Sequence, residues 1–155
     1  MKENSVNIEK MLKRVVIVSM VLLIVSSSLY FLFESKVIAS KYGNSDEYFL
    51  SEAHGDSMYP TIKDGDLLVI KEYEDNSFNI SVGDIIVCWW EERNIYVSHR
   101  VIMITNVDGE NRYYLKGDNN LNEDTLYITD DKIVGKVEHI VHGWLDKKIY
   151  EAIMW

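Results

Sequence analysis

The sequence predicts a small, mainly β domain that follows one N-terminal transmembrane helix. Two observations predict this architecture. The segment 15–33 contains no charged residue, and beyond residue 46 short apolar runs rich in β-branched and aromatic residues alternate with turn residues. A length of 155 residues allows one modest domain and one additional segment, but not two full domains. With 47% hydrophobic and 26% charged residues, the composition also excludes a disordered chain.

The uncharged segment 15–33 is long enough to cross a bilayer, because its 19 residues extend over about 28 Å as a helix. It is apolar on every face, unlike a helix on the surface of a soluble protein. Three basic residues immediately precede it: Lys10, Lys13 and Arg14. This basic excess predicts that residues 1–14 stay in the cytoplasm and that the rest of a single-pass protein lies outside the plasma membrane, or in the lumen if the protein is eukaryotic.

A cleaved signal peptide is the alternative interpretation of the same segment. Val37 and Ala39 resemble a small-residue cleavage site, but the apolar run is longer than the core of about 7–15 residues that signal peptides contain. We therefore expect a retained anchor in the lipid bilayer, followed by a polar linker at 34–45. Residues 34–155 carry 23 acidic and 12 basic residues, and this net charge of −11 favours solubility and repels anionic lipid.

Residues 46–142 have the pattern of a compact β domain. Six segments with strand character are separated by turn residues: 48–53, 67–73, 84–90, 95–107, 112–116 and 133–141. Asp108-Gly109 is typical of a type I′ hairpin turn, and Gly135 predicts a bulge in the last strand. Apolar residues recur at helical spacing over 143–155, which predicts an amphipathic helix that either packs on the β domain or lies on the outer leaflet.

The segment 55–61 places a serine close to the only proline of the chain. Pro60 fixes its own φ and favours an extended Tyr59, so the backbone beside Ser57 is stiff and holds the hydroxyl in one place. Gly55 allows another part of the chain to approach closely. The same residue types are common in ordinary turns, and taken alone the segment is better explained as a turn.

His99 lies inside the apolar run 95–107, where a core residue is expected. An isolated histidine in such a run is usually a hydrogen-bonded structural residue. A serine hydroxyl, however, is a weak nucleophile that needs a base. Histidine, with an ordinary pKa of about 6.5, can accept that proton at neutral pH, whereas a lysine would first have to be desolvated. Pairing Ser57 with His99 is therefore chemically coherent.

A third segment, 116–124, is dominated by polar residues that also fit a solvated loop. It contains two carboxylates that are candidates for orienting His99 and stabilising its charged form, Asp118 and Asp124. The residue types leave the choice between them open.

These three segments, in this order behind an anchor, resemble the type I signal peptidases. Segment 55–61 is similar to the nucleophile box of that family, and Gly65-Asp66 and 83–87 follow it as they do there. The common bacterial branch has a lysine base where this chain has His99. The segments 99–101 and 116–120 resemble instead the endoplasmic-reticulum-type branch, which also occurs in archaea and in some Gram-positive bacteria.

The resemblance implies a small β domain of the signal-peptidase and LexA-like type, with no cofactor and no metal. It implies a membrane-bound serine endopeptidase that removes signal peptides from exported preproteins after small residues. Ser57 matches the nucleophile and His99 matches the general base. Asp124 matches the third member, and Asp118 is the alternative. The sequence identifies no accessory subunit.

On this interpretation the Ser57 backbone N–H stabilises the oxyanion. We expect the substrate to contact five residues, two of them beside the serine and three on the strand that ends at His99: Asp56, Met58, Tyr96, Val97 and Ser98. Asp56 and Tyr59 stand where the branch usually has glycine and glutamate, so the resemblance does not define the shape of the substrate groove.

Two other functions fit parts of the pattern: a non-catalytic, membrane-tethered β domain that binds proteins, and a LexA-like self-cleaving regulatory peptidase. A net charge of −9 argues against binding to nucleic acid. The single cysteine, Cys88, excludes an internal disulfide and a zinc cage of cysteines, and it is expected to be buried. His139 and His142 lack a further ligand nearby, so no metal site is predicted.

Overall fold

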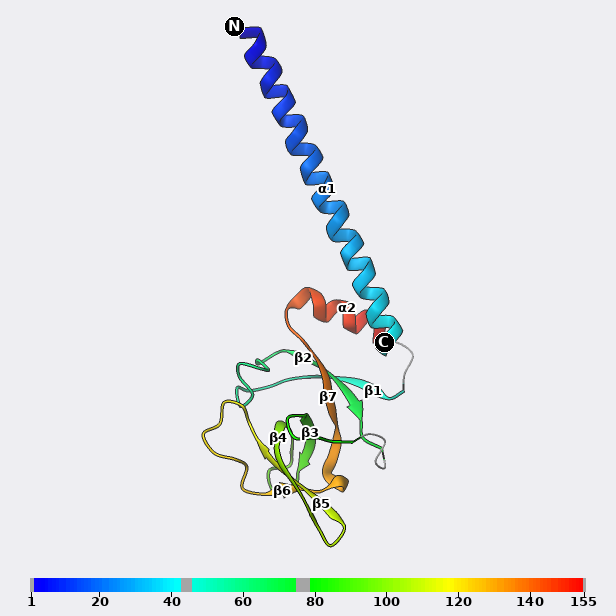
Figure 1. Cartoon of the computed structure of the whole chain (residues 1–155), viewed down its shortest axis with the longest axis vertical. Coiled ribbons are helices and arrows are strands. Elements are labelled where there is room, and N and C mark those ends of the chain that lie inside the picture. Colours follow the sequence, from blue (N-terminus) through cyan, green and yellow to red (C-terminus); the bar gives the residue numbers. More distant parts are fainter. Residues whose placement is uncertain (1, 43–45, 75–78, 155) are drawn as a thin grey trace. The chain divides into compact units, whose positions relative to one another are not determined.

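The computed structural model describes residues 2–42, 46–74 and 79–154 (Figure 1). The chain divides into two units, helix α1 (Lys2–Tyr42) and a β domain that contains all the described strands. The part of α1 from Lys10 to Tyr42 is long and apolar enough to cross a membrane. A polar linker was expected over 34–45, but helix α1 continues through residues 34–42. The helix is not interrupted there because this segment contains no glycine or proline.

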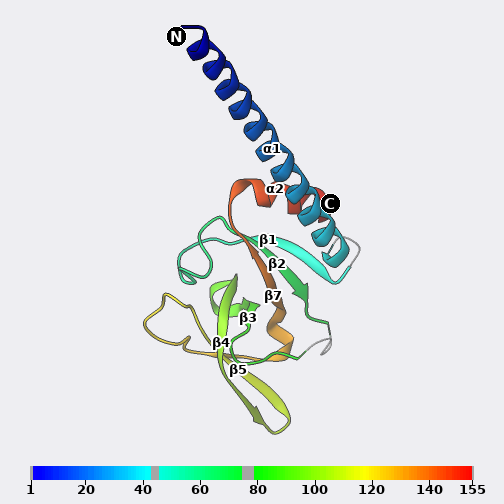
Figure 2. The same cartoon turned by 45° about the horizontal axis from the view of Figure 1, so that its top comes forward.

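The β domain is built on one antiparallel sheet with the strand order β1-β2-β7-β3-β4-β5-β6 (Figure 2). The strands are β1 (Tyr48–Glu52), β2 (Leu67–Glu72), β3 (Ile85–Trp90), β4 (Ile95–Val107), β5 (Glu110–Lys116), β6 (Tyr127–Ile128) and β7 (Ile133–Val141). The predicted mainly β fold is confirmed. The short strand β6 was not predicted, because two residues cannot display an alternating pattern.

The β4–β5 hairpin turns at Asp108-Gly109 as predicted. Both residues have positive φ values, 53° and 89°, and Val107 pairs directly with Glu110 across the turn. A type I′ turn requires left-handed conformations at both central positions, which glycine and aspartate tolerate better than most residues. The turn therefore sets the register of β5 against β4.

Strand β7 contains two bulges, and neither is at Gly135. Against β3, Gly135 pairs with Val87 and Ile133 pairs with Cys88, so Val134 is the extra residue. Against β2, Glu138 is the extra residue between the paired residues Val137 and His139. Gly135 is required for a different reason: a Cβ at this position would collide with the Ile70 side chain and the Lys71 backbone. The predicted bulge at Gly135 is thus wrong by one position, and the glycine allows β2 to approach β7 closely.

Two apolar clusters form the core of the β domain. One cluster includes Ile86, Cys88, Val101 and Leu115, and the other includes Met58, Ile62, Leu68 and Val87. Cys88 is fully buried, as expected, and burial followed by the nearby charge of Asp124 raises its pKa to about 12. Because successive residues of β3 point to opposite sides, this strand contributes to both clusters.

The chain closes with helix α2 (Trp144–Met154), which confirms the predicted C-terminal helix. Its Lys147 lies 3.6 Å from Glu52 of β1, and its Tyr150 ring stacks on His139 of β7 with 5.7 Å between centroids. Helix α2 therefore contacts the β domain, as the first of the two expected arrangements requires.

Candidate active site

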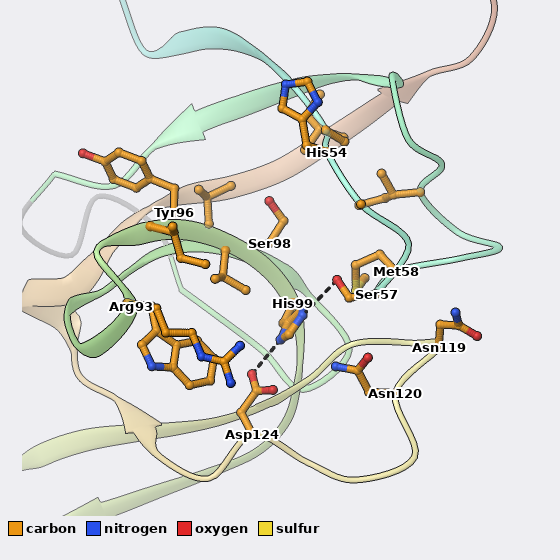
Figure 3. Close-up of a pocket in the computed structure, with 18 of the residues that line it drawn as sticks. His54, Ser57, Met58, Arg93, Tyr96, Ser98, His99, Asn119, Asn120 and Asp124 are labelled. Atoms are coloured by element: carbon orange, nitrogen blue, oxygen red, sulfur yellow. Dashed lines mark hydrogen bonds and ion pairs between the residues drawn. The ribbon is translucent and has the colours of Figure 1, made fainter.

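A groove of about 830 Å³ crosses the β domain where β4 has an unpaired edge. β3 pairs with β4 over residues 95–100, but β5 begins to pair only at Arg100, so residues 95–99 have a partner strand on one side alone. Segments 51–55 and 119–125 line the groove together with this edge (Figure 3). An exposed strand edge can accept an extended peptide through backbone hydrogen bonds.

Ser57 lies in a tight turn that is anchored in the core. Tyr59 N donates to Asp56 O (3.0 Å) and Ile62 N donates to Met58 O (2.9 Å), and the Met58 and Ile62 side chains are buried on either side of the Tyr59–Pro60 bond, which is cis. The turn therefore holds the serine hydroxyl at the wall of the groove instead of leaving it in bulk solvent.

His99 reaches both Ser57 and Asp124 (Figure 3). Its Nε2 is 3.1 Å from Ser57 Oγ, and its Nδ1 is 2.6 Å from Asp124 Oδ2. The His99 and Asp124 side chains are each only 7% exposed. A carboxylate can only accept, so Nδ1 carries a hydrogen and donates it to Asp124, which leaves Nε2 as the acceptor for the Ser57 hydroxyl.

The loop after β5 positions Asp124. Its backbone N donates to Leu115 O (2.9 Å), while Asn119 N donates to Ser57 O (2.8 Å) and Asn119 Nδ2 donates to Asp56 O (3.1 Å). One loop is therefore tied both to the core and to the serine turn, so that carboxylate, imidazole and hydroxyl have defined relative positions.

Gly117 makes the approach of this loop possible. A Cβ on Gly117 would lie 2.6 Å from Ser57 O and 2.6 Å from Asn120 Nδ2, far inside normal contact distance. Only a glycine lets the serine turn and the loop come this close.

Asp118, the alternative to Asp124, bonds to other groups. Arg100 Nε and Nη2 donate to its two carboxylate oxygens (2.8 and 2.6 Å), and Thr61 Oγ1 donates to Oδ2 (2.5 Å). Arg100 Nη1 also donates to Gly83 O (2.7 Å). The bidentate Arg100–Asp118 pair, together with Thr61, therefore links the serine turn, β4 and the loop next to His99.

The Arg100 guanidinium and the Thr61 hydroxyl hold the pKa of Asp118 below its ordinary value, against the opposing effect of burial. Because the folded state has the lower pKa, the pair stabilises the fold at a pH above the ordinary pKa of aspartate, about 4. That contribution disappears as the pH falls through the lowered pKa of the folded protein.

Four of the five residues expected to contact substrate line the groove: Met58, Tyr96, Val97 and Ser98. Met58 is buried in the groove floor, whereas Tyr96 is 66% exposed at the rim. Asp56 is not among the lining residues, and its backbone O accepts hydrogen bonds from Tyr59 and Asn119 instead.

Sequence reasoning missed the apolar floor of the groove. It is made by Ile62, Leu68 and Val87, which come from three distant segments and had no signal beyond being apolar. It also missed the Thr61–Asp118–Arg100 network, although Arg100 directly after His99 was visible as a charged residue within an apolar strand.

Within the part of the chain that the structure describes, no three His, Cys, Asp or Glu residues form a metal-binding group. His142 Nδ1 lies 2.7 Å from the buried Asp66 carboxylate, and His139 stacks on Tyr150. These two histidines therefore have structural partners.

Comparison with known families adds an independent observation. Residues 24–138, about three quarters of the chain, match the family model described as Peptidase S24-like. The chain belongs to this family. The matched segment of this chain includes Ser57, His99 and Asp124.

Two signal peptidases are also similar to part of this chain. Signal peptidase I W of Bacillus subtilis (strain 168) is 30% identical over 86 residues, which cover 56% of this chain and 44% of that protein. The signal peptidase complex catalytic subunit SEC11 of Saccharomyces cerevisiae (strain YJM789) is 36% identical over 87 residues, 55% of this chain and 50% of that protein. The chain spans about half the length of the curated relatives it matches. The resemblance to signal peptidases is confirmed.

Proposed function

We propose that this protein is a membrane-anchored serine endopeptidase that removes signal peptides from exported preproteins. The observation that carries the proposal is the continuous chain of hydrogen bonds from Ser57 Oγ through His99 to Asp124, beside an unpaired strand edge. A nucleophile, a base and a group that orients the base are the three parts that acyl transfer requires. The signal peptidase relatives support the substrate class.

In the first step Ser57 Oγ attacks the carbonyl carbon of the scissile bond. The new O–C bond forms as the carbonyl π pair moves to its oxygen, and the hydroxyl proton passes to His99 Nε2. The Ser57 backbone N–H has no hydrogen-bond partner among the residues that the structure describes, so it is free to donate to the oxyanion. Asp124 stabilises the imidazolium that forms.

In the second step the tetrahedral intermediate collapses and the C–N bond breaks. The proton on His99 Nε2 moves to the leaving amine, which becomes the N-terminus of the mature protein. Water then attacks the acyl-enzyme, with the same nitrogen as its base, and releases the signal peptide with a free carboxylate. As the ester bond to Ser57 Oγ breaks, His99 Nε2 passes the proton taken from water to Ser57 Oγ, so the enzyme is regenerated.

The groove accounts for small residues before the scissile bond. A substrate strand paired with residues 95–98 of β4 directs alternate side chains to the face of Ser98, opposite to that of His99. On that face Val87, the cross-strand partner of Ser98, lies with Leu68 and Ile62 in the floor. These side chains line the groove beneath the proposed substrate strand, and this apolar floor favours small apolar side chains at alternating positions.

The proposed topology follows the charge around α1. The basic residues before the apolar run keep the N-terminus in the cytoplasm, and the acidic β domain lies outside the plasma membrane. An anchored enzyme and a preprotein in the same bilayer meet in two dimensions, which raises their effective concentration.

Reconstitution of the full chain in detergent with a secretory preprotein tests this proposal. We expect a single cut after a small residue, located by N-terminal sequencing, and no cut when the first or third residue before it is replaced by tryptophan. The mass of the enzyme should stay unchanged. Self-cleavage would favour a regulatory peptidase, and an intact preprotein under all conditions would favour a non-catalytic binding domain.

A further inference from the structure

The oxyanion that forms at Ser57 needs more than one donor for strong stabilisation, and the residues next to Ser57 in the chain supply none from their side chains. Gly55 has no side chain, Asp56 has a carboxylate, and Met58 has a thioether whose sulfur accepts a hydrogen bond from Asp118 N (3.4 Å). The Ser57 backbone N–H is therefore a single donor unless another segment contributes one.

Asn120 is the groove residue best placed to contribute it. It is half-buried and lines the groove, and its side-chain amide makes no hydrogen bond to any described residue. The Asn120 amide and the serine turn both contact Gly117. A Cβ added to Gly117 would lie 2.6 Å from Asn120 Nδ2 and 2.6 Å from Ser57 O, so the amide is next to the serine turn. Figure 3 shows the Asn120 amide beside the Ser57–His99–Asp124 group.

The backbone beneath Asn120 is held in place. Asn120 N donates to Gly117 O (3.0 Å), and the preceding residue is bonded to the serine turn through Asn119 N and Nδ2. The donor is thus carried by a loop that cannot shift without the serine. Preorganised donors of this kind act without a cost of reorganisation when charge develops.

Other donors near the groove are less suitable. The Asn119 amide is already bonded to Asp56 O. The Ser98 hydroxyl belongs to a residue adjacent to His99 on β4, so it points to the opposite face from the imidazole. Of these three neighbouring side chains, Asn120 is the one whose N–H has no bond to a described residue and whose loop is tied to the serine turn.

We propose that Asn120 Nδ2 donates the second hydrogen bond to the oxyanion, together with the Ser57 backbone N–H. The inference rests on the proposed serine peptidase function and deepens it. When Ser57 Oγ attacks, the carbonyl oxygen gains the electron pair of the broken π bond, and the Asn120 amide stabilises that charge without giving up its proton. Asn120 is accordingly a catalytic residue that acts in the transition state and not in substrate binding.

The test compares Asn120→Ala and Asn120→Asp with the wild-type chain on the same preprotein. We expect kcat to fall by about 10²- to 10³-fold in both variants, with KM nearly unchanged. A peptide boronate, which forms a tetrahedral adduct with the serine, should bind each variant more weakly by a similar factor. Asn106→Ala, which removes an equivalent amide from the β4–β5 hairpin outside the groove, is the matched control and should cleave at the wild-type rate.

A structural role is separated from a catalytic one by a second measurement. Adding Asn120→Ala to the Ser57→Ala chain should leave its affinity for an uncleaved peptide unchanged, and thermal unfolding should show that the variants are folded. Wild-type kcat in Asn120→Ala, or a loss of peptide affinity as large as the loss of rate, would overturn the inference while the proposed function stands. If the wild-type chain neither cleaves the preprotein nor binds the boronate, both fall.

Discussion

Alanine at Ser57 or at His99 is expected to lower kcat for preprotein cleavage by about 10⁴-fold or more, with little change in KM. In the proposed mechanism Ser57 Oγ supplies the attacking electron pair. His99 Nε2, 3.1 Å away, removes the hydroxyl proton, because a protonated hydroxyl is a weak nucleophile. The groove that binds the substrate is unchanged in both variants. Initial rates of appearance of the mature N-terminus measure the effect.

The double variant Ser57→Ala/His99→Ala provides an internal control. Because the two side chains act as one unit, the double variant should be hardly slower than either single variant. Ser81→Ala removes an exposed hydroxyl outside the groove and should cleave at the wild-type rate. Cleavage by His99→Ala at the wild-type rate would show that another group is the base.

Asparagine at Asp124 is expected to lower kcat by about 10⁴-fold while the fold is preserved. The amide can donate to His99 Nδ1, which favours the tautomer with its hydrogen on Nε2 and removes the acceptor that Ser57 needs. The amide also cannot stabilise the imidazolium that forms during attack. Cleavage rates near neutral pH, together with the free energy of unfolding from denaturant titration, measure the two effects separately.

Asp118→Asn is the matched comparison, because it changes the same chemical group in the same loop. Since Asp118 pairs with Arg100 and not with His99, this variant should lose about 1–3 kcal/mol of stability near neutral pH and much less activity. Its stability should also vary less between about pH 5 and 2 than that of the wild type, since the carboxyl with the lowered pKa is gone. If Asp118→Asn were inactive at full stability and Asp124→Asn remained active, the assignment of the third member would be reversed.

Much of the fold could be predicted from local patterns in the sequence. Apolar runs rich in β-branched and aromatic residues located β4 and β7, and the Asp108-Gly109 turn set the β4–β5 register. The end of α1 was missed because charge marks where a helix leaves the bilayer, not where its backbone hydrogen bonds stop. The bulge was misplaced at Gly135 because the need for glycine comes from β2, a strand more than 60 residues earlier in the chain.

The candidate site was predictable only in part. Chemistry and family resemblance pointed to Ser57 and His99, but their meeting depends on the packing of a turn against a strand 42 residues later. The choice between Asp118 and Asp124 required the loop geometry, since both carboxylates follow the same glycine. The role proposed for Asn120 as an oxyanion donor could not be predicted from the sequence, because an unbonded amide is recognised only when the partners of its neighbours are known.

Capture of the acyl group tests the central claim most directly. The wild-type chain cleaves a preprotein in the presence of increasing hydroxylamine, and the released signal peptide is analysed by mass spectrometry. Attack by Ser57 predicts a signal peptide with a C-terminal hydroxamate. The share of this product should rise with the hydroxylamine concentration, because hydroxylamine competes with water for the acyl-enzyme. A signal peptide that ends only in a free carboxylate at every hydroxylamine concentration, while cleavage continues at its normal rate, would contradict a covalent intermediate on Ser57.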